Sequence, residues 1–321
     1  GLAMPYLSRA ADRPRIEGGI ASGDVAADSA VIWARADRAA RMVVECATDD
    51  SFKAILGVAS AEALPDSDFT SKLLLGGLPA GQDIFYRVRF ENIAEAGISG
   101  EAHVGHFRTA PVERRSVSFA WSGDTAGQGW GIDPARGGMR TYRTMLENRP
   151  DFFIHCGDHI YADCPIESEL KLSDGGSWRN IVTEDKSVVA QSLAQFRGNY
   201  KYNLLDENLR AFNAQVPMLA QWDDHEVTND WSPIGTADET GYAEDGTSRL
   251  VARAARAFHE FMPIRSTAAQ AGRIYRKVSY GPLLDVFLID MRSYRDSTLN
   301  RRGDGIDACI LGPLQLAWLK R

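Results

Sequence analysis

The first third of the chain alternates between apolar and polar positions. The segments with this pattern are 30–36 (AVIWARA), 41–48 (RMVVECAT), 71–78 (SKLLLGGL), 83–91 (DIFYRVRFE) and 105–111 (GHFRTAP). Gly, Asp, Ser and Pro, the residues that favour turns, separate these segments, and no long amphipathic helix pattern interrupts them. Short strands at this spacing predict an antiparallel β-sandwich over residues 16–111.

The pattern changes near residue 112, after the segment TAPVERRS. Beyond this point strand patterns alternate with longer patterns of helical period, as in layered α/β proteins. The predicted strands are 116–122, 151–156, 215–222, 273–281 and 283–291, and the predicted helices are 137–149, 187–200, 248–262 and one that begins at 312. We therefore expect a multidomain β and α/β protein, with a β-sandwich at 16–111 of immunoglobulin or fibronectin type and an α/β domain at 112–321.

Composition narrows the classes of function. The chain has 44% hydrophobic and 25% charged residues, which is ordinary for a folded, water-soluble protein. A net charge of -7 without a long Lys/Arg block argues against a nucleic-acid-binding module and against an anionic membrane surface. No apolar stretch approaches the roughly 18 to 20 residues of a membrane span. The opening segment has no hydrophobic signal core, so an exported precursor would have lost its signal peptide.

The four cysteines are Cys46, Cys156, Cys164 and Cys309. None stands in a CxxC pair, which argues against a structural zinc site. Cys46 and Cys156 lie in apolar runs that are typical of buried thiols. Disulfide pairing stays open, because Cys156 reaches Cys164 only if the intervening loop doubles back.

Three of the predicted strands end in acidic residues. The strand at 116–122 runs into Gly123 and Asp124, the strand at 151–156 runs into Gly157 and Asp158, and the strand at 215–222 runs into the segment DDHE at 223–226. In an open α/β sheet the carboxyl ends of the strands form the crevice that binds ligands, so these endings are expected to converge. Helix caps and turns are the alternative reading of each aspartate taken alone.

Carboxylates packed at one crevice repel one another unless cations neutralise them. Asp124, Asp158 and Asp224 supply hard oxygen donors and Tyr161 a phenolate, a set suited to Fe, Mn, Mg or Ca. The phenolate in particular suggests ferric iron. His225, beside Asp224, is then the candidate catalytic residue, as a proton donor or a stabiliser of the transition state. The alternative for Tyr161 is a ring that packs on a helix.

Several neighbours receive smaller roles. Asp223 and Glu226 are expected to orient the metal ligands, and the carboxamide of Asn229 is a candidate to approach a second metal. His155 lies in an apolar run and is expected to be a core histidine, while His159 is a candidate to line the pocket. Arginines in the segments YRTMLENR and MRSYRD have the geometry for phosphate, but solvated faces and ion pairs are commoner, so none is assigned.

The order of these motifs resembles the metallophosphoesterases, and more closely the alkaline phosphatase D (PhoD-like) family of phosphatases and phosphodiesterases. The resemblance covers nearly the whole chain. It rests on GIASGDVAADSAVIWARA, FRTAP, HCGDHIYAD, FRGNYKYNLLDENLRAFNAQVPMLAQWDDHEVTNDW and IDMRSYRD. WDDHE after an apolar strand is a specific signal, whereas GDxxY alone is weak.

The resemblance implies an exported enzyme, periplasmic or extracellular, with a fibronectin-like domain followed by an αββα sandwich that holds iron with calcium or another divalent ion. Asp158 would bridge the metals, Asp124 and Tyr161 would lie on the iron side, Asp224 would bind the second metal and His225 would lie over the phosphate. The expected reaction is hydrolysis of phosphoric mono- or diesters by a metal-bound hydroxide, with a phosphate ester as the substrate. The oligomeric state stays open.

The chain departs from the family pattern at two places. Some PhoD-like enzymes have a cysteine iron ligand after the first strand of the catalytic domain, where this chain has Gly123 and Asp124, so cysteine ligation is excluded there. The family also has a late histidine element that supplies metal ligands, and nothing after His259 matches it. The chain is therefore expected to lack a carboxyl-terminal part. The competing hypothesis is a phosphatase-like binding protein with impaired catalysis.

Overall fold

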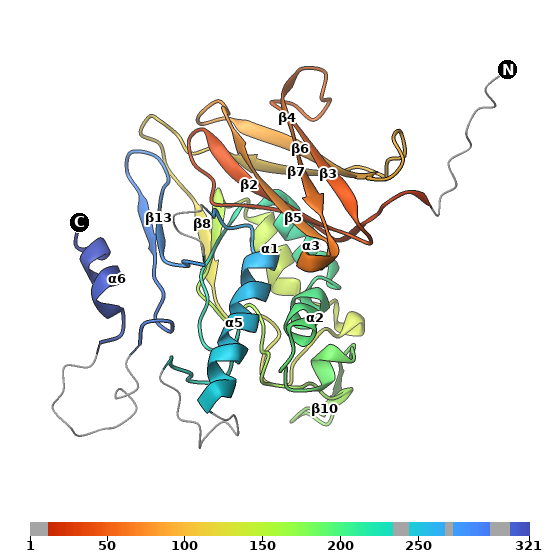
Figure 1. Cartoon of the computed structure of the whole chain (residues 1–321), viewed down its shortest axis with the longest axis vertical. Coiled ribbons are helices and arrows are strands. Elements are labelled where there is room, and N and C mark those ends of the chain that lie inside the picture. The colour runs from red at the N-terminus through yellow and green to blue at the C-terminus, as the bar shows by residue number, and fades with distance from the viewer. Residues whose placement is uncertain (1–11, 234–243, 267–271, 296–308) are drawn as a thin grey trace.

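The first seven strands build the β-sandwich. The computed structural model describes residues 12–233, 244–266, 272–295 and 309–321. The strands are β1 (Ile16–Gly23), β2 (Ser29–Ala36), β3 (Ala40–Ala47), β4 (Ile55–Ala63), β5 (Thr70–Gly76), β6 (Asp83–Asn92) and β7 (His103–Arg108). A four-stranded antiparallel sheet, β4-β3-β6-β7, packs against a sheet that contains β5-β2-β1 (Figure 1). Alternate residues of β6 are buried between the two sheets, as a period of two requires.

The second sheet continues into the rest of the chain. Its order is β5-β2-β1-β12-β9-β8, where β8 is Phe119–Ser122, β9 is Phe152–His155 and β12 is Met218–Ala220. The strands β8, β9 and β12 are mutually parallel, and β1 joins them through the parallel pair Gly23 and Met218. The predicted boundary near residue 112 falls between β7 and β8. We keep 16–111 and 112–321 as proposed domains, joined by this continuous sheet.

Helices cover one face of β8, β9 and β12. They are α1 (Arg140–Glu147), α2 (Leu193–Asn203), α3 (Glu207–Gln215) and α5 (Glu244–Phe261). Phe153 and Ala220 from the sheet share one apolar cluster with Tyr142, Phe212 and Phe258 from three of these helices. Helix α2 begins six residues later than the sequence predicted, because the side chain of Ser192 accepts a hydrogen bond from the backbone of Gln195 in a capping box.

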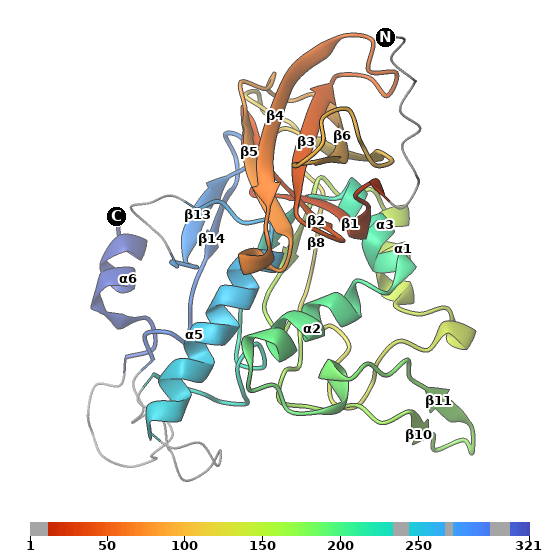
Figure 2. The same cartoon turned by 45° about the vertical axis from the view of Figure 1, so that its right-hand side comes forward.

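A hairpin covers the opposite face. Strands β13 (Arg276–Ser279) and β14 (Asp285–Leu288) bury Val278 and Leu288 in the cluster that contains Phe152 and Leu219. Helix α6 (Gly312–Leu319) packs Trp318 on the outer side of the hairpin, against Phe287, with ring centroids 5.9 Å apart. The order of layers is therefore helices, sheet, hairpin and helix (Figure 2), which confirms the predicted fold class.

The smaller elements are the hairpin of β10 (Glu169–Lys171) and β11 (Ser177–Arg179), and the 3-10 turns η2 (Pro65–Ser67), η3 (Pro134–Arg136) and η4 (Asp185–Ser187). Among the described residues, no helix is both long and apolar enough to span a bilayer.

We expect Gly23→Ala to destabilise the protein by about 2–3 kcal/mol, because overpacking a close backbone contact costs this much. A Cβ at Gly23 would lie 2.7 Å from the carbonyl oxygen of Met218 and still closer to that of Pro263. Gly76→Ala is the matched control, because no atom lies within 4 Å of its Cβ position. Urea unfolding monitored by circular dichroism measures both. Equal effects of the two substitutions would contradict the close packing of β1 on β12.

Candidate metal centre

Two strand ends turn sharply to present their aspartates. Asp124 and Asp158 have φ angles of 60° and 56°, a left-handed conformation in which aspartate is one of the more tolerated residues. Gly157, at φ 117°, allows the turn between β9 and Asp158. The two turns are bound to each other, because the backbone N–H of Asp124 donates to the carbonyl of Gly157 (3.2 Å) and that of Thr125 to the carbonyl of Asp158 (2.9 Å). Their carboxylates therefore emerge side by side.

The structure brings all five predicted site residues together. A carboxylate oxygen of Asp158, one of Asp224 and a ring nitrogen of His225 lie within 4.8 Å of one another, and all three side chains are buried. The Tyr161 hydroxyl donates to Asp124 Oδ1 at 3.0 Å, and the His225 backbone N–H donates to Asp158 Oδ1 at 3.2 Å. Asp124 itself is exposed at the rim of the cluster.

The acidic groups of the cluster have raised pKa values. Burial, the hydrogen bond with Asp124 and the charge of Asp224 raise the pKa of Asp158 to about 7. Burial, the charge of Asp158 and the hydrogen bond with Asp124 also raise the pKa of the Tyr161 phenol. Each shift reflects the cost of placing one more negative charge among the others. A bound cation removes that cost, so this donor set fits a metal ion.

Glu226 holds the backbone under the cluster. Its fully buried carboxylate accepts hydrogen bonds from the backbone N–H groups of Asp158 (3.2 Å), His159 (2.6 Å) and Asp223 (2.9 Å). Burial and the charge of Asp158 raise the pKa of Glu226 to about 8, although the three hydrogen bonds act in the opposite direction. Glu226 and the turn that carries Asp158 are thus fixed to each other, which agrees with an orienting role for this side chain.

Asp163 is a site residue that the sequence reasoning missed. Its carboxylate oxygens lie 2.8 and 3.0 Å from Nδ1 of His225, and it also accepts the backbone N–H of Asn229 at 2.7 Å. Burial lowers the pKa of His225, but the hydrogen bond with Asp163 and the surrounding carboxylates outweigh burial and raise it to about 8. The Tyr161 ring stacks on the imidazole, with centroids 4.2 Å apart. The sequence feature that could have identified Asp163 is an acidic residue two positions after the candidate ligand Tyr161.

Arg292 is the second residue that was missed. Its guanidinium lies 2.5 Å from Asp223, 3.3 Å from Asp224 and 3.3 Å from Asp230. It comes from the segment after β14 and neutralises part of the acidic cluster. No arginine of this segment was assigned to phosphate from the sequence, because solvated faces and ion pairs are commoner, and Arg292 indeed forms ion pairs.

One cysteine lies near the cluster. All four cysteines are free thiols. The sulfur of Cys164 lies within 4.8 Å of donor atoms of Asp163 and His225. Burial and the charge of Asp163 raise the pKa of Cys164 to about 11, so the thiol is protonated in the metal-free chain.

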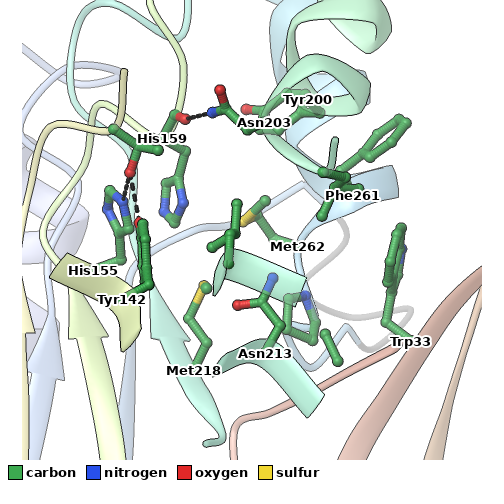
Figure 3. A pocket seen from close by; sticks show the side chains of 15 residues that line it. Trp33, Tyr142, His155, His159, Tyr200, Asn203, Asn213, Met218, Phe261 and Met262 are labelled. Atoms are coloured by element: carbon green, nitrogen blue, oxygen red, sulfur yellow. Dashed lines mark hydrogen bonds between the residues drawn. The ribbon is translucent and has the colours of Figure 1, made fainter. Parts of the chain in front are cut away.

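His155 and His159 lie behind the cluster, on the helical side of the sheet. Their rings stack 3.6 Å apart, and His155 Nε2 lies 2.9 Å from Thr125 Oγ1, which also contacts the Tyr142 hydroxyl (Figure 3). Burial lowers the pKa of His155 to about 3, so this histidine is neutral. Both histidines line a cavity of about 50 Å³ inside the apolar core. This placement agrees with the expectation of a core histidine at position 155.

Comparison with known proteins assigns this fold and site to a class. The sequence model of the PhoD-like phosphatases matches residues 119–321, and that of their N-terminal domain matches residues 1–111. The chain belongs to the PhoD-like phosphatase family.

Two relatives illustrate the similarity. The chain is 26% identical to alkaline phosphatase D of Bacillus subtilis (strain 168), over 94% of this chain and 52% of that protein. A solved structure of PhoD superposes with a TM-score of 0.77 at 26% identity, over 94% of this chain and 58% of that one. The chain thus spans little more than half the length of these relatives.

Proposed function

We propose that this protein is a metal-dependent hydrolase of phosphoric mono- or diesters. The observation that carries the proposal is the convergence of carboxylate oxygens from Asp158 and Asp224 beside a ring nitrogen of His225. These atoms lie within 4.8 Å of one another, at the ends of two parallel strands, in a member of a phosphatase family. Asp124 and Tyr161, hydrogen-bonded to each other at 3.0 Å, extend the donor set at the rim.

The donors suggest how two ions would be held. Asp158 lies between the others and is proposed to bridge the metals, with Asp124 and Tyr161 on the side of a ferric ion and Asp224 on the side of calcium or another divalent ion. When bound, the ions supply Lewis acidity, which generates a hydroxide nucleophile from water and offsets the charge of the phosphoryl oxygens. Carboxylate and phenolate oxygens are suitable ligands for such hard cations.

Two residues of the chain are proposed to supply a proton: His225 as the donor and Asp163 as the residue that orients it. When protonated, His225 Nδ1 donates to Asp163, and this hydrogen bond fixes the orientation of the imidazole ring in the site. A pKa of about 8 keeps the imidazole protonated at neutral pH, so His225 is able to donate to the phosphoryl group or to the leaving alcohol. Arg292 holds Asp223 and Asp224 in place beside it.

The test of the function is metal content and phosphate release measured on the same sample. We expect a metal-loaded protein to release inorganic phosphate from an aryl phosphate and to show the visible absorption band of tyrosinate bound to ferric iron. A metal-loaded protein that shows the band and releases no phosphate would instead support the phosphatase-like binding protein. Absence of metal binding altogether would overturn both.

We expect His225→Ala to lower kcat by about 10²- to 10⁴-fold, the usual contribution of a general acid. Activity should fall as pH rises above about 8, because the protonated imidazole is the active form and is lost above its pKa. Asp163→Asn removes the charge that raises this pKa, so the alkaline limb should move to lower pH. A pH profile of kcat for each variant measures this shift.

The control for both variants is the histidine and aspartate pair of the β-sandwich. His106 Nε2 on β7 lies 3.0 Å from Asp83 Oδ1 on β6, in the four-stranded sheet, which carries none of the cluster residues. His106→Ala and Asp83→Asn are expected to leave kcat and its pH profile unchanged. An alkaline limb that stays in place in Asp163→Asn would show that His225 does not act as the proton donor.

The compartment is a further part of the proposal. Family resemblance supports export to the periplasm or the cell exterior. Fractionation of the native cells, followed by detection of the protein with an antibody, tests this, and a cytoplasmic location would contradict it.

A further inference from the structure

A large pocket opens beside Asp124. Its volume is about 750 Å³, which is within the range of small-molecule binding sites. Its lining includes Ser122 at the end of β8, the following residues to Gly127, Arg140 at the start of α1, and the indoles of Trp130 and Trp178. Because Asp124 belongs to the metal centre, whatever fills this pocket lies next to the reacting phosphate.

The tryptophan wall is rigidly built. Trp178, on β11, meets Trp130 edge to face, with ring centroids 5.6 Å apart and planes at 80°. The Trp178 indole N–H donates to the carbonyl of Gly131 at 3.2 Å and to Asn180 Oδ1 at 3.0 Å. Asn180 Oδ1 also accepts the backbone N–H of Gly131 at 2.8 Å. Trp130 is thereby held in place while 43% of its surface remains exposed.

Cationic groups lie beside the aromatic surface. The guanidinium of Arg136 is 5.6 Å from the centre of the Trp178 ring and donates to the carbonyl of Ser177 at 3.1 Å. This guanidinium covers Trp178, so the indole available for stacking is that of Trp130. Arg140 adds a second positive charge to the lining of the pocket. An exposed indole beside guanidinium groups complements a planar ring that is joined to an anionic ester.

We infer that this pocket binds the alcohol half of the ester when that half carries a planar aromatic ring, such as a nucleobase, stacked on Trp130. The inference rests on the proposed function for the reaction but concerns the selectivity of the site. Trp178 positions Trp130, and Arg136 contacts the polar edge of the ring. The preferred substrates are therefore nucleotide-like esters rather than esters of small aliphatic alcohols.

The test compares adenosine monophosphate with glycerol phosphate as substrates. We expect Trp130→Leu to reduce the ratio of kcat/KM for the two esters by about 5- to 100-fold, the usual contribution of stacking one base on an aromatic side chain. The matched control is Trp121→Leu, because Trp121 is 71% exposed on β8 and lies outside the pocket. This control should keep the ratio. Arg136→Gln should also reduce it and serves if Trp130→Leu fails to fold.

A second test does not depend on turnover. It measures the binding of adenosine alone by equilibrium dialysis. Wild type and Trp121→Leu should bind adenosine, and Trp130→Leu should bind it several-fold more weakly. If both esters are hydrolysed with a ratio that Trp130→Leu leaves unchanged, the inference is overturned while the proposed function survives. If neither ester is hydrolysed, the proposed monoesterase activity fails, and adenosine binding still decides the inference.

Discussion

Replacing Asp158 with asparagine is expected to reduce metal affinity and kcat by at least about a hundredfold, because even residues that only orient metal ligands cost about 10- to 100-fold. Asp158 lies at the centre of the cluster, in contact with the backbone of His225 and close to Asp224. Asparagine keeps the size of the side chain and removes the charge that attracts the cations. Metal analysis and phosphate release on purified protein measure the two effects.

The same substitution should stabilise the metal-free protein. The pKa of Asp158 is about 7 in the folded chain and near 3.8 in an ordinary environment, so the folded state binds the proton more tightly than the unfolded state. Stability of the metal-free protein is therefore lost as pH rises from about 4 through 7. Asparagine removes this loss. Thermal unfolding of metal-free samples between about pH 4 and about pH 7.5, which spans this window, measures it.

Asp50→Asn is the control for Asp158, because Asp50 is exposed in a turn of the β-sandwich. It should change neither activity nor the pH dependence of stability. A variant of Asp158 that kept its metal and its turnover would show that this carboxylate is not a ligand, and the proposed metal centre would have to be abandoned.

Replacing Glu226 with alanine is expected to lower the free energy of unfolding by on the order of 4 kcal/mol, because each buried N–H left without an acceptor costs about 1–3 kcal/mol. Glu226 accepts three backbone N–H groups, from Asp158, His159 and Asp223. Glu226→Gln should also destabilise, since its amide nitrogen would face a donor. Urea unfolding measures the loss.

Activity of Glu226→Ala should fall as well, because the turns that carry Asp158 and Asp224 lose their common anchor. Glu147→Ala on α1 is the control, since this side chain is exposed and lies 4.0 Å from Arg143. Its cost should stay below about 0.5 kcal/mol. A stable Glu226→Ala variant would mean that water replaces the carboxylate, and the proposed anchoring role would be wrong.

The strand patterns were enough to predict the fold class and to gather the site. Asp124 and Asp158 each follow a strand that is parallel to its neighbour, and parallel strands present their carboxyl ends at the same edge of the sheet. For this reason the sequence alone predicted that these aspartates meet Asp224 and His225. Their roles as metal ligands and catalytic residue stay predictions.

What the sequence did not reveal depends on contacts between distant segments. Arg292 reaches Asp223 from 69 residues away, and the sequence does not say which arginine of the segment does so. Apart from its place near Tyr161, nothing in the sequence distinguishes Asp163 from other acidic loop residues, and its contact with Nδ1 of His225 depends on the fold. The hairpin β10-β11 also escaped notice, because three-residue strands are too short to show a period.

Helix α3 was missed for a different reason. It spans Glu207–Gln215, where the polar residues Asn208, Arg210 and Asn213 obscure the apolar positions. The side chain of Asp206 caps its first turn by accepting the backbone N–H of Leu209. The cap depends only on neighbouring residues. The start of the helix could therefore have been predicted from the capping residue, although not from the hydrophobic pattern.

The pairing of β1 with β12 makes the sandwich and the phosphatase region share structural elements on both sides of residue 112. Asp24, just after β1, forms an ion pair with the buried Arg276 of β13, and the Trp33 indole donates to the carbonyl of Glu260 on α5. Neither region is thus a cassette that can be exchanged between family members. Chimaeras joined at residue 112 should aggregate unless their partner surfaces are transplanted together, and the native chain should melt in a single cooperative step.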